Sequence, residues 1–176
     1  MVTSVLPLSM NYERPEPSAP VGQSVKPIGN LAQIMRGIYF PSANLIFDVQ
    51  QRDPTTPHEK SETDGSVTGK YADVYSGWES VENAAVSLVD SGDLLLNPDR
   101  LCQNGRPVPA RDPNYQRFAR EMRAAGLVVL RAARLKDQAL VSEATSNLAD
   151  ACSGCHRVYR RGRPESMERC TAPLNK

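Results

Sequence analysis

Four stretches of the chain repeat apolar residues at the spacing of one face of an α-helix, and none alternates them as a half-buried strand does. The expected helices cover about residues 31–50, 71–95, 114–135 and 136–162. Their inner stripes are Leu31, Ile34, Met35, Ile38, Leu45 and Val49; Val74, Trp78, Val81, Ala85 and Leu88; Tyr115, Phe118, Met122, Ala125, Val129 and Ala132; and Leu140 or Val141, Ala144, Leu148, Cys152, Cys155 and Tyr159. Such helices must bury these faces against one another. The sequence therefore predicts an all-α fold, an antiparallel four-helix bundle.

Proline and glycine divide the chain into three parts. Residues 1–29 are proline-rich and predict an extended arm, residues 30–162 hold the helices, and residues 163–176 form a C-terminal tail. Asn30 is the expected N-cap of the first helix. Pro41 lies inside that helix, where its ring would press on the carbonyl of Gly37, so a kinked continuation and a break are equally expected.

The end of the last expected helix carries the sequence Cys152-Ser153-Gly154-Cys155-His156. Two cysteines three apart, followed at once by histidine, form the attachment signature of c-type haem. On a helical turn the two thiols can reach the two vinyl groups on one haem edge, while the imidazole binds the iron. The motif predicts one covalently attached haem c, with Cys152 and Cys155 as thioether anchors and His156 as the proximal iron ligand.

Other uses of a Cys-x-x-Cys pair fit less well. A zinc site needs four ligands, and the remaining candidates, Cys102, Cys170, His58 and the carboxylates, form no second paired knuckle. A thioredoxin-like pair should open a helix after a buried strand, whereas this pair sits near the end of a helical stretch. Two buried thiols that act only as small hydrophobes remain the plainest alternative.

Composition bears on partners and compartment. The 176 residues carry a formal net charge of +1 with dispersed basic residues, so a nucleic-acid partner is not expected, and no apolar run approaches 18 residues, so no membrane span is expected. Covalent haem attachment normally takes place outside the cytoplasmic membrane. We therefore expect a periplasmic or otherwise exported protein. Residues 1–10 lack a complete secretory signal, so the signal was removed or lies upstream; the alternative is a cytoplasmic protein that receives no haem.

Cys102 and Cys170 are the two cysteines outside the motif. In an oxidising compartment they predict a disulfide, because neither has another partner. This bond would tie the tail to the connection between the second and third helices. Two free buried thiols are the alternative.

The last helix resembles that of class II c-type cytochromes, the cytochrome c prime family. In that family a sequence of the form Cys-x-x-Cys-His-x-x-Tyr/Phe-Arg/Lys ends the fourth helix of a bundle, and here Tyr159 and Arg160 follow the motif at those positions. The resemblance covers about residues 30–162. It also includes Met35-Arg36 with Pro41 downstream in the first helix.

The resemblance implies two states for the sixth iron position. It is either filled by a methionine of the first helix, for which Met35 is the candidate, or open and walled by an apolar residue. In the second state Ile34, Ile38 or Tyr39 would cover the iron and Met35 would be core packing. Arg36, Arg160 and Arg161 are candidate partners of the haem propionates. His58 is expected in an exposed loop, and Trp78 as a core anchor.

The leading functional hypothesis is a monohaem electron carrier that exchanges electrons with donor and acceptor proteins. It is not expected to be an enzyme, because no nucleophile with a positioned base accompanies the motif. A binder of NO or CO with an open distal site, and a haem subunit of a larger redox complex, are the alternatives. A homodimer also stays open, since the exposed faces do not decide it.

Overall fold

The computed structural model describes residues 26–56 and 76–171, and the regular structure of these residues is helical. The elements are α1 (Leu31–Ile34), the π-helix η1 (Met35–Tyr39), α2 (Phe40–Asp48), α4 (Gly77–Asp90), α5 (Gly92–Leu95), α6 (Pro113–Arg134) and α7 (Gln138–Tyr159). Within the described ranges the β pairing is limited to one isolated bridge, between Leu101 and Pro107. The all-α prediction is confirmed for this part of the chain. None of the helices described is long and apolar enough to cross a membrane.

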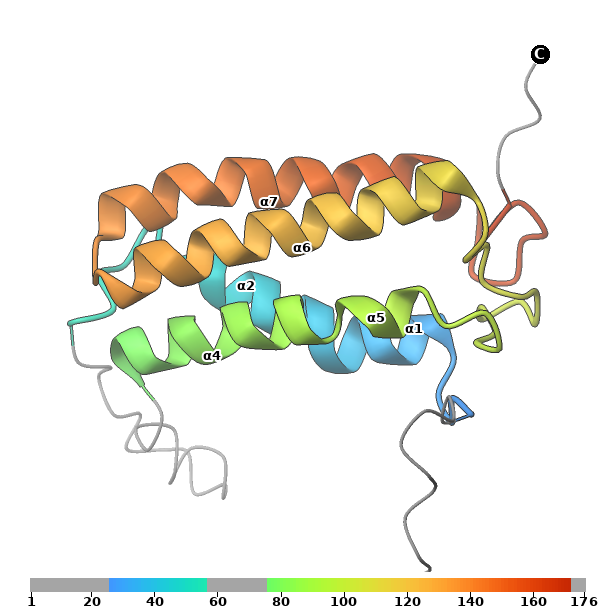
Figure 1. Ribbon diagram of the computed structural model, residues 1–176, viewed down its shortest axis with the longest axis horizontal. Coiled ribbons are helices and arrows are strands. Elements are labelled where there is room, and N and C mark those ends of the chain that lie inside the picture. Colours follow the sequence, from blue (N-terminus) through green and yellow to red (C-terminus); the bar gives the residue numbers. More distant parts are fainter. Residues whose placement is uncertain (1–25, 57–75, 172–176) are drawn as a thin grey trace, which may run out of the picture.

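Consecutive long elements run in opposite directions and pack side by side (Figure 1). α6 packs against both α7 and α4, and α2 packs mainly on α4 and also touches α7. The start of α1, α5, the start of α6 and the end of α7 lie together at one end of the molecule, which we call the motif end. The end of α2, the start of α4 and the α6–α7 turn form the far end.

The first helical segment continues through Pro41 by means of a π-turn. Asn30 caps α1 as predicted, in a reciprocal pair of hydrogen bonds with Gln33. In η1 the Phe40 N–H donates to the carbonyl of Met35, five residues back. This wider turn adds one residue to the helix just before proline, where an ordinary α-ladder would bring the ring against Gly37.

The extra residue shifts the inner face of α2. The predicted position Leu45 is 37% exposed, whereas Ile46 is fully buried. Tyr39 is likewise buried beside the half-buried Ile38. The predicted stripe was therefore wrong at Leu45, because a uniform 3.6-residue period does not hold across a π-turn.

The predicted second helix is divided in the structure. Ser76 has an extended backbone and α4 begins at Gly77; the helix then breaks at Ser91, before the short α5. The first residues of the prediction, 71–75, lie outside the described residues. Trp78 is buried as expected, with its indole N–H donating to the Thr55 hydroxyl over 3.2 Å. Val74 and His58 lie outside the described residues.

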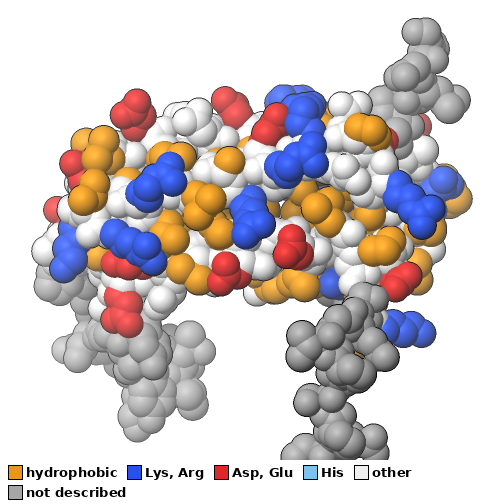
Figure 2. All heavy atoms as spheres, viewed as in Figure 1, with side chains coloured by type: hydrophobic (Ala, Val, Ile, Leu, Met, Phe, Trp, Pro, Cys, Tyr) orange, Lys and Arg blue, Asp and Glu red, His pale blue; other side chains and the backbone are white. Residues whose placement is uncertain are grey.

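The third and fourth helices match their predictions closely. α6 begins at Pro113, one residue before the predicted start, and all six residues of its predicted stripe are buried. α7 runs from Gln138 to Tyr159 after the N-cap Asp137, and buries Val141 of the two alternatives considered. These two helices form the most closely packed pair of the molecule. On the face seen in Figure 2, basic side chains lie among acidic and apolar ones without a continuous basic patch.

Candidate haem site

The motif occupies the last two turns of α7. Cys152, Cys155 and His156 are all helical and half-buried, and both cysteines are free thiols. The helix ends directly after them, where the Arg160 N–H donates to the carbonyl of His156 over 3.0 Å. These three residues lie in the last turns of a helix, as predicted. One rigid segment presents both thiols and the imidazole with part of each side chain accessible.

Gly154 brings the backbone of α7 against α6. A Cβ at this position would lie 2.8 Å from Cε1 and 3.3 Å from Cδ1 of Phe118. Only a residue without a side chain allows this approach. The glycine between the two cysteines therefore faces the core, which fixes the rotation of α7 at the motif.

Three aromatic side chains hold the end of α7. Tyr159 packs edge-to-face on Tyr115, with ring centroids 5.1 Å apart, and on Phe118, at 6.3 Å. The hydroxyl of Tyr159 is buried and makes no hydrogen bond to any described residue. Burial and the nearby Asp112 carboxylate raise its pKa, and Asp112 also caps α6 by accepting from the N–H groups of Asn114 and Tyr115. The motif thus stands beside one unsatisfied polar atom.

The motif side chains favour their uncharged forms. Burial raises the pKa of the Cys152 thiol, and burial together with Cys152 raises the pKa of Cys155 to about 12. Burial, then Arg160 and Arg169, lower the pKa of His156. A reactive dithiol shows the opposite shift, toward thiolate. The pair therefore lacks the electrostatics of a redox-active Cys-x-x-Cys.

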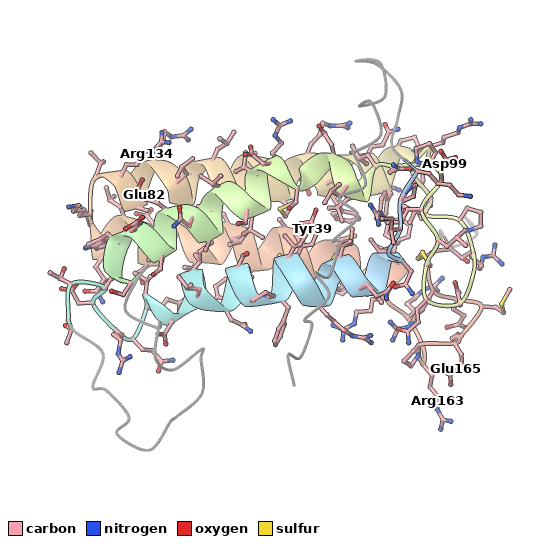
Figure 3. The ribbon with its side chains drawn as sticks, turned by 90° about the horizontal axis from the view of Figure 1, so that it is seen from below. Tyr39, Glu82, Asp99, Arg134, Arg163 and Glu165 are labelled. Carbon is pink, nitrogen blue, oxygen red and sulfur yellow. A yellow bond between two sulfur atoms is a disulfide. The ribbon has the colours of Figure 1, made fainter. Side chains whose placement is uncertain are left out.

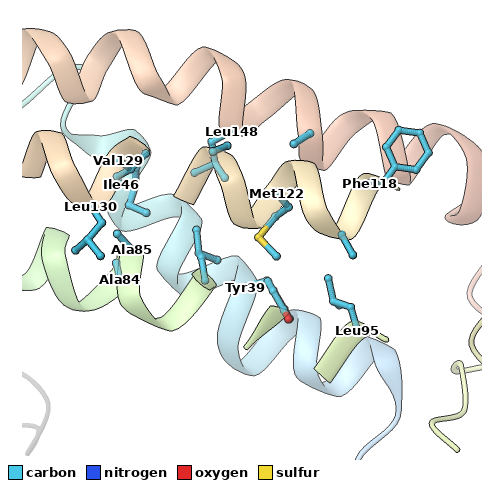
Figure 4. Close-up of a cluster of buried hydrophobic side chains, with 14 of the residues drawn as sticks. Tyr39, Ile46, Ala84, Ala85, Leu95, Phe118, Met122, Val129, Leu130 and Leu148 are labelled. Carbon is cyan, nitrogen blue, oxygen red and sulfur yellow. The ribbon is translucent and has the colours of Figure 1, made fainter. Parts of the chain in front are cut away.

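α1, η1 and α2 form one continuous helical rod, the first helical rod. At the motif end it faces the core from the side opposite α7 (Figure 1). Met35 is half-buried in η1 and packs against the core. Tyr39, four residues on, points inward and donates its hydroxyl to the carbonyl of Ser91 over 2.5 Å (Figures 3 and 4). Figure 4 also shows Leu95, Met122 and Phe118 around this part of the interior. The structure thus places Met35 at the same end of the molecule as His156.

The predicted propionate partners differ in their surroundings. Arg36 is exposed and donates to Gln103 over 3.3 Å, and Arg160 is also exposed. Arg161 is half-buried and donates to the carbonyls of Val158 and Thr171. Arg36 and Arg160 can contact a group at the surface of the molecule, whereas Arg161 is held at the end of α7 by its two hydrogen bonds.

Cys102 and Cys170 form a disulfide with their Cα atoms 6.6 Å apart, which confirms the predicted pairing. The tail is bound further by Asn104, whose side-chain amide donates to the carbonyls of Ser166 and Arg169. The Cys170 N–H donates to the carbonyl of Tyr159 over 2.9 Å. The bond and the loops that it joins lie at the motif end (Figure 3).

Arg100 is a buried residue that the sequence did not single out. Only 5% of it is exposed, and it lies at the motif end between α5 and the start of α1. It belongs to a proline-rich connection with no helical period. Nothing in the local sequence marks it as buried.

Comparison of the chain with models of known protein families, with curated proteins and with solved structures finds no match in any of the three. The assignment of a haem site therefore depends on the chemistry of Cys152, Cys155 and His156 alone. Among residues 26–56 and 76–171, no group of three or more His, Cys, Asp or Glu side chains converges as a directly bound metal ion requires. A c-type haem makes a different demand, since its two thioethers and its iron ligand attach at separate points. The residues of α7 fit that group.

Proposed function

We propose that the protein is an exported monohaem c-type cytochrome that carries single electrons, built as an antiparallel four-helix bundle like the class II cytochromes. The observation that carries this proposal is the placement of Cys152, Cys155 and His156 on the last two turns of α7, half-buried and free of other bonds. A bound haem supplies a one-electron Fe(III)/Fe(II) couple.

Each residue of the site has a distinct part in this proposal. Cys152 and Cys155 anchor the cofactor, and His156 holds the iron from the proximal side. Gly154 packs against Phe118, and this contact sets the rotation of α7 at the motif. Burial at this end excludes water from the iron and so tunes its potential. The Cys102–Cys170 disulfide supports an exported, periplasmic location, because such bonds persist in oxidising compartments.

Met35 is the proposed sixth ligand. Its thioether is a soft ligand, and it is half-buried at the motif end, packed against the core. One observation favours an open sixth iron position instead. The buried Tyr39 and the half-buried Ile38 lie on the same helical rod as Met35 and could cover the iron without binding it. In that case the protein would bind NO or CO.

Optical spectra of the exported protein test both levels of the proposal. An oxidised and a dithionite-reduced spectrum, with and without CO, should show a low-spin haem that CO leaves unchanged. Met35→Leu should then convert the iron to high spin and allow CO to bind. Met122→Leu, at a methionine buried in α6, is the matched control and should leave the spectrum as it was. Low-spin iron in Met35→Leu would reject the ligand assignment, and CO binding by the wild type would favour the gas binder.

Covalent attachment is tested separately. Haem should remain on the wild-type chain after denaturation and be lost from the double variant Cys152→Ala, Cys155→Ala. The variant Cys102→Ser, Cys170→Ser is the control, because it removes the same number of sulfur atoms outside the motif. A wild-type chain without covalent haem would reject the proposed function.

A further inference from the structure

Arg100 is held firmly in the interior of the motif end. Its Nε donates to the carbonyl of Leu94 over 3.0 Å, at the end of α5, and an Nη1 hydrogen goes to the carbonyl of Gly29, just before α1. Its own backbone N–H donates to Asn97, and its carbonyl accepts from Val108. These bonds use two of the five guanidinium donors and leave three N–H groups for another acceptor.

The charge of Arg100 has no anionic partner among the described residues. The ion pairs seen between two described residues, Arg117 with Glu121 and Arg134 with Glu82, do not include Arg100. Burial of a guanidinium without a paired anion is costly, and two neutral carbonyls offset only part of that cost. An anion bound to Arg100 would therefore stabilise this buried charge, and no described residue supplies one as an ion-pair partner.

The charge of Arg100 acts on the hydroxyls of Tyr39 and Tyr115, and burial raises the pKa of both, to about 12 for Tyr39. Asp93, whose carboxylate also acts on Tyr39, is exposed and forms no ion pair with Arg100. Neither hydroxyl is ionised at neutral pH, so neither supplies the missing anion.

Direct contacts connect the segment of Arg100 to the motif. Arg100 lies two residues before Cys102, whose disulfide partner Cys170 donates its backbone N–H to the carbonyl of Tyr159 over 2.9 Å. Tyr159 follows Cys155 by one helical turn and packs edge-to-face on Tyr115, with ring centroids 5.1 Å apart. A haem attached at Cys155 carries two carboxylates, and guanidinium is the side chain best matched to carboxylate geometry. We propose that Arg100 forms the buried ion pair with a carboxylate of the haem, an inference that rests on the proposed function.

The buried location distinguishes Arg100 from the arginines chosen on sequence. Arg36 and Arg160 are exposed, so water and salt screen their charge. Arg100 acts through a less polar interior, where a fixed positive charge favours the reduced iron. Arg100 should therefore raise the reduction potential more than the exposed Arg36 does.

The test compares holoproteins that differ in one charge. Arg100→Gln removes the charge but keeps a donor for the two carbonyls, Arg100→Lys keeps the charge without the fork, and Arg36→Gln is the exposed control. Haem content is measured first, then the midpoint potential and the thermal unfolding temperature. We expect Arg100→Gln to lower the potential clearly more than Arg36→Gln does, with an unchanged spin state, and Arg100→Lys to keep most of the wild-type potential.

Two results would overturn the inference. One is an equal potential in Arg100→Gln and Arg36→Gln, and the other is an equal shift of the potential in Arg100→Gln and Arg100→Lys. Either would mean that Arg100 only holds two carbonyl groups in place. If Arg100→Gln does not fold, the propionate bands of the resonance Raman spectrum decide it: they should shift in Arg100→Lys, and no shift overturns it. Absence of haem from the wild type would reject the proposed function itself. A haem that is present, but whose potential and Raman bands do not change with residue 100, would reject only this inference.

Discussion

The two ends of the molecule bury different kinds of side chain. At the far end the interior is mainly aliphatic and includes Ile46, Val129 and Val141, which are fully buried on three helices. The buried polar atoms of Trp78 and Thr145 there are hydrogen-bonded. At the motif end the buried residues include several large aromatic or polar side chains: Tyr39, Tyr115, Phe118, Tyr159 and Arg100.

The motif end is organised differently. It holds a buried cation without an anion, a buried hydroxyl without a hydrogen bond, and two half-buried thiols. Buried polar groups in proteins are normally satisfied, so several exceptions in one place indicate a site and not a core. The Cys102–Cys170 disulfide and the hydrogen bonds from Asn104 to the tail stabilise this end of the molecule. The comparison shows that the far end is stabilised by hydrophobic packing, whereas the motif end depends in addition on a disulfide and on hydrogen bonds to the tail.

The largest effect is expected at the far end, from Ile46→Ala. The side chain is fully buried, so its truncation should lower the free energy of unfolding by about 2–5 kcal/mol. Leu45→Ala, at the neighbouring 37% exposed position, should cost much less. Denaturant unfolding of both variants measures the difference, and the haem spectrum should stay unchanged. Equal losses would contradict the register that the π-turn imposes on α2.

The next effect is expected at the motif end, on removal of the disulfide. The bond joins residues 68 apart in sequence, and Cys102→Ser with Cys170→Ser should lower the free energy of unfolding by about 2–4 kcal/mol. Haem content should be retained, because these cysteines lie outside the motif. The comparison of the two ends would break if this variant were as stable as the wild type, since the motif end would then not depend on the disulfide.

The sequence predicted best the parts of the fold that depend on local pattern. The limits of α6 follow from Asp112 and Pro113 at its start and from an unbroken stripe of six buried residues. The motif was equally visible, because its residues are adjacent in the chain. The inner face of the first helix was predicted correctly except at Leu45, since nothing in residue spacing shows that the backbone inserts a π-turn before Pro41.

The missed features depend on tertiary contacts. Gly154 fits the motif as any small residue would, and only the structure shows Phe118 against its Cα. Arg100 lies in an irregular connection, where periodicity gives no signal of burial. The early end of α4 likewise depends on Ser91, whose carbonyl accepts from the distant Tyr39. Contacts between segments far apart in sequence decide all three.

A smaller effect is expected from Gly154→Ala. The new Cβ would lie 2.8 Å from a ring atom of Phe118, and such overpacking costs about 1–3 kcal/mol, offset in part by the helix preference of alanine. Because α7 must move away from α6, haem incorporation should also fall, and Phe118→Leu in the same chain should restore both. Gly37→Ala is the control, because its Cβ meets nothing within 4 Å. Equal stability of the two alanine variants would rule out a tight contact at the motif.

The smallest effect compares the two ends by the same kind of substitution. Asn30 caps α1 at the motif end, and Asp137 caps α7 at the far end by accepting from the Leu140 N–H. Replacement of either by alanine should cost about 1 kcal/mol in thermal or denaturant unfolding. Only Asn30→Ala should also alter the haem spectrum, because fraying of the four-residue α1 reaches Met35 in the next turn, whereas the cap of α7 lies at the opposite end from the motif. Asn30→Asp keeps the cap and should behave as the wild type. If both alanine variants changed the spectrum equally, the two ends would not be separable, and the aliphatic core would be part of the haem site.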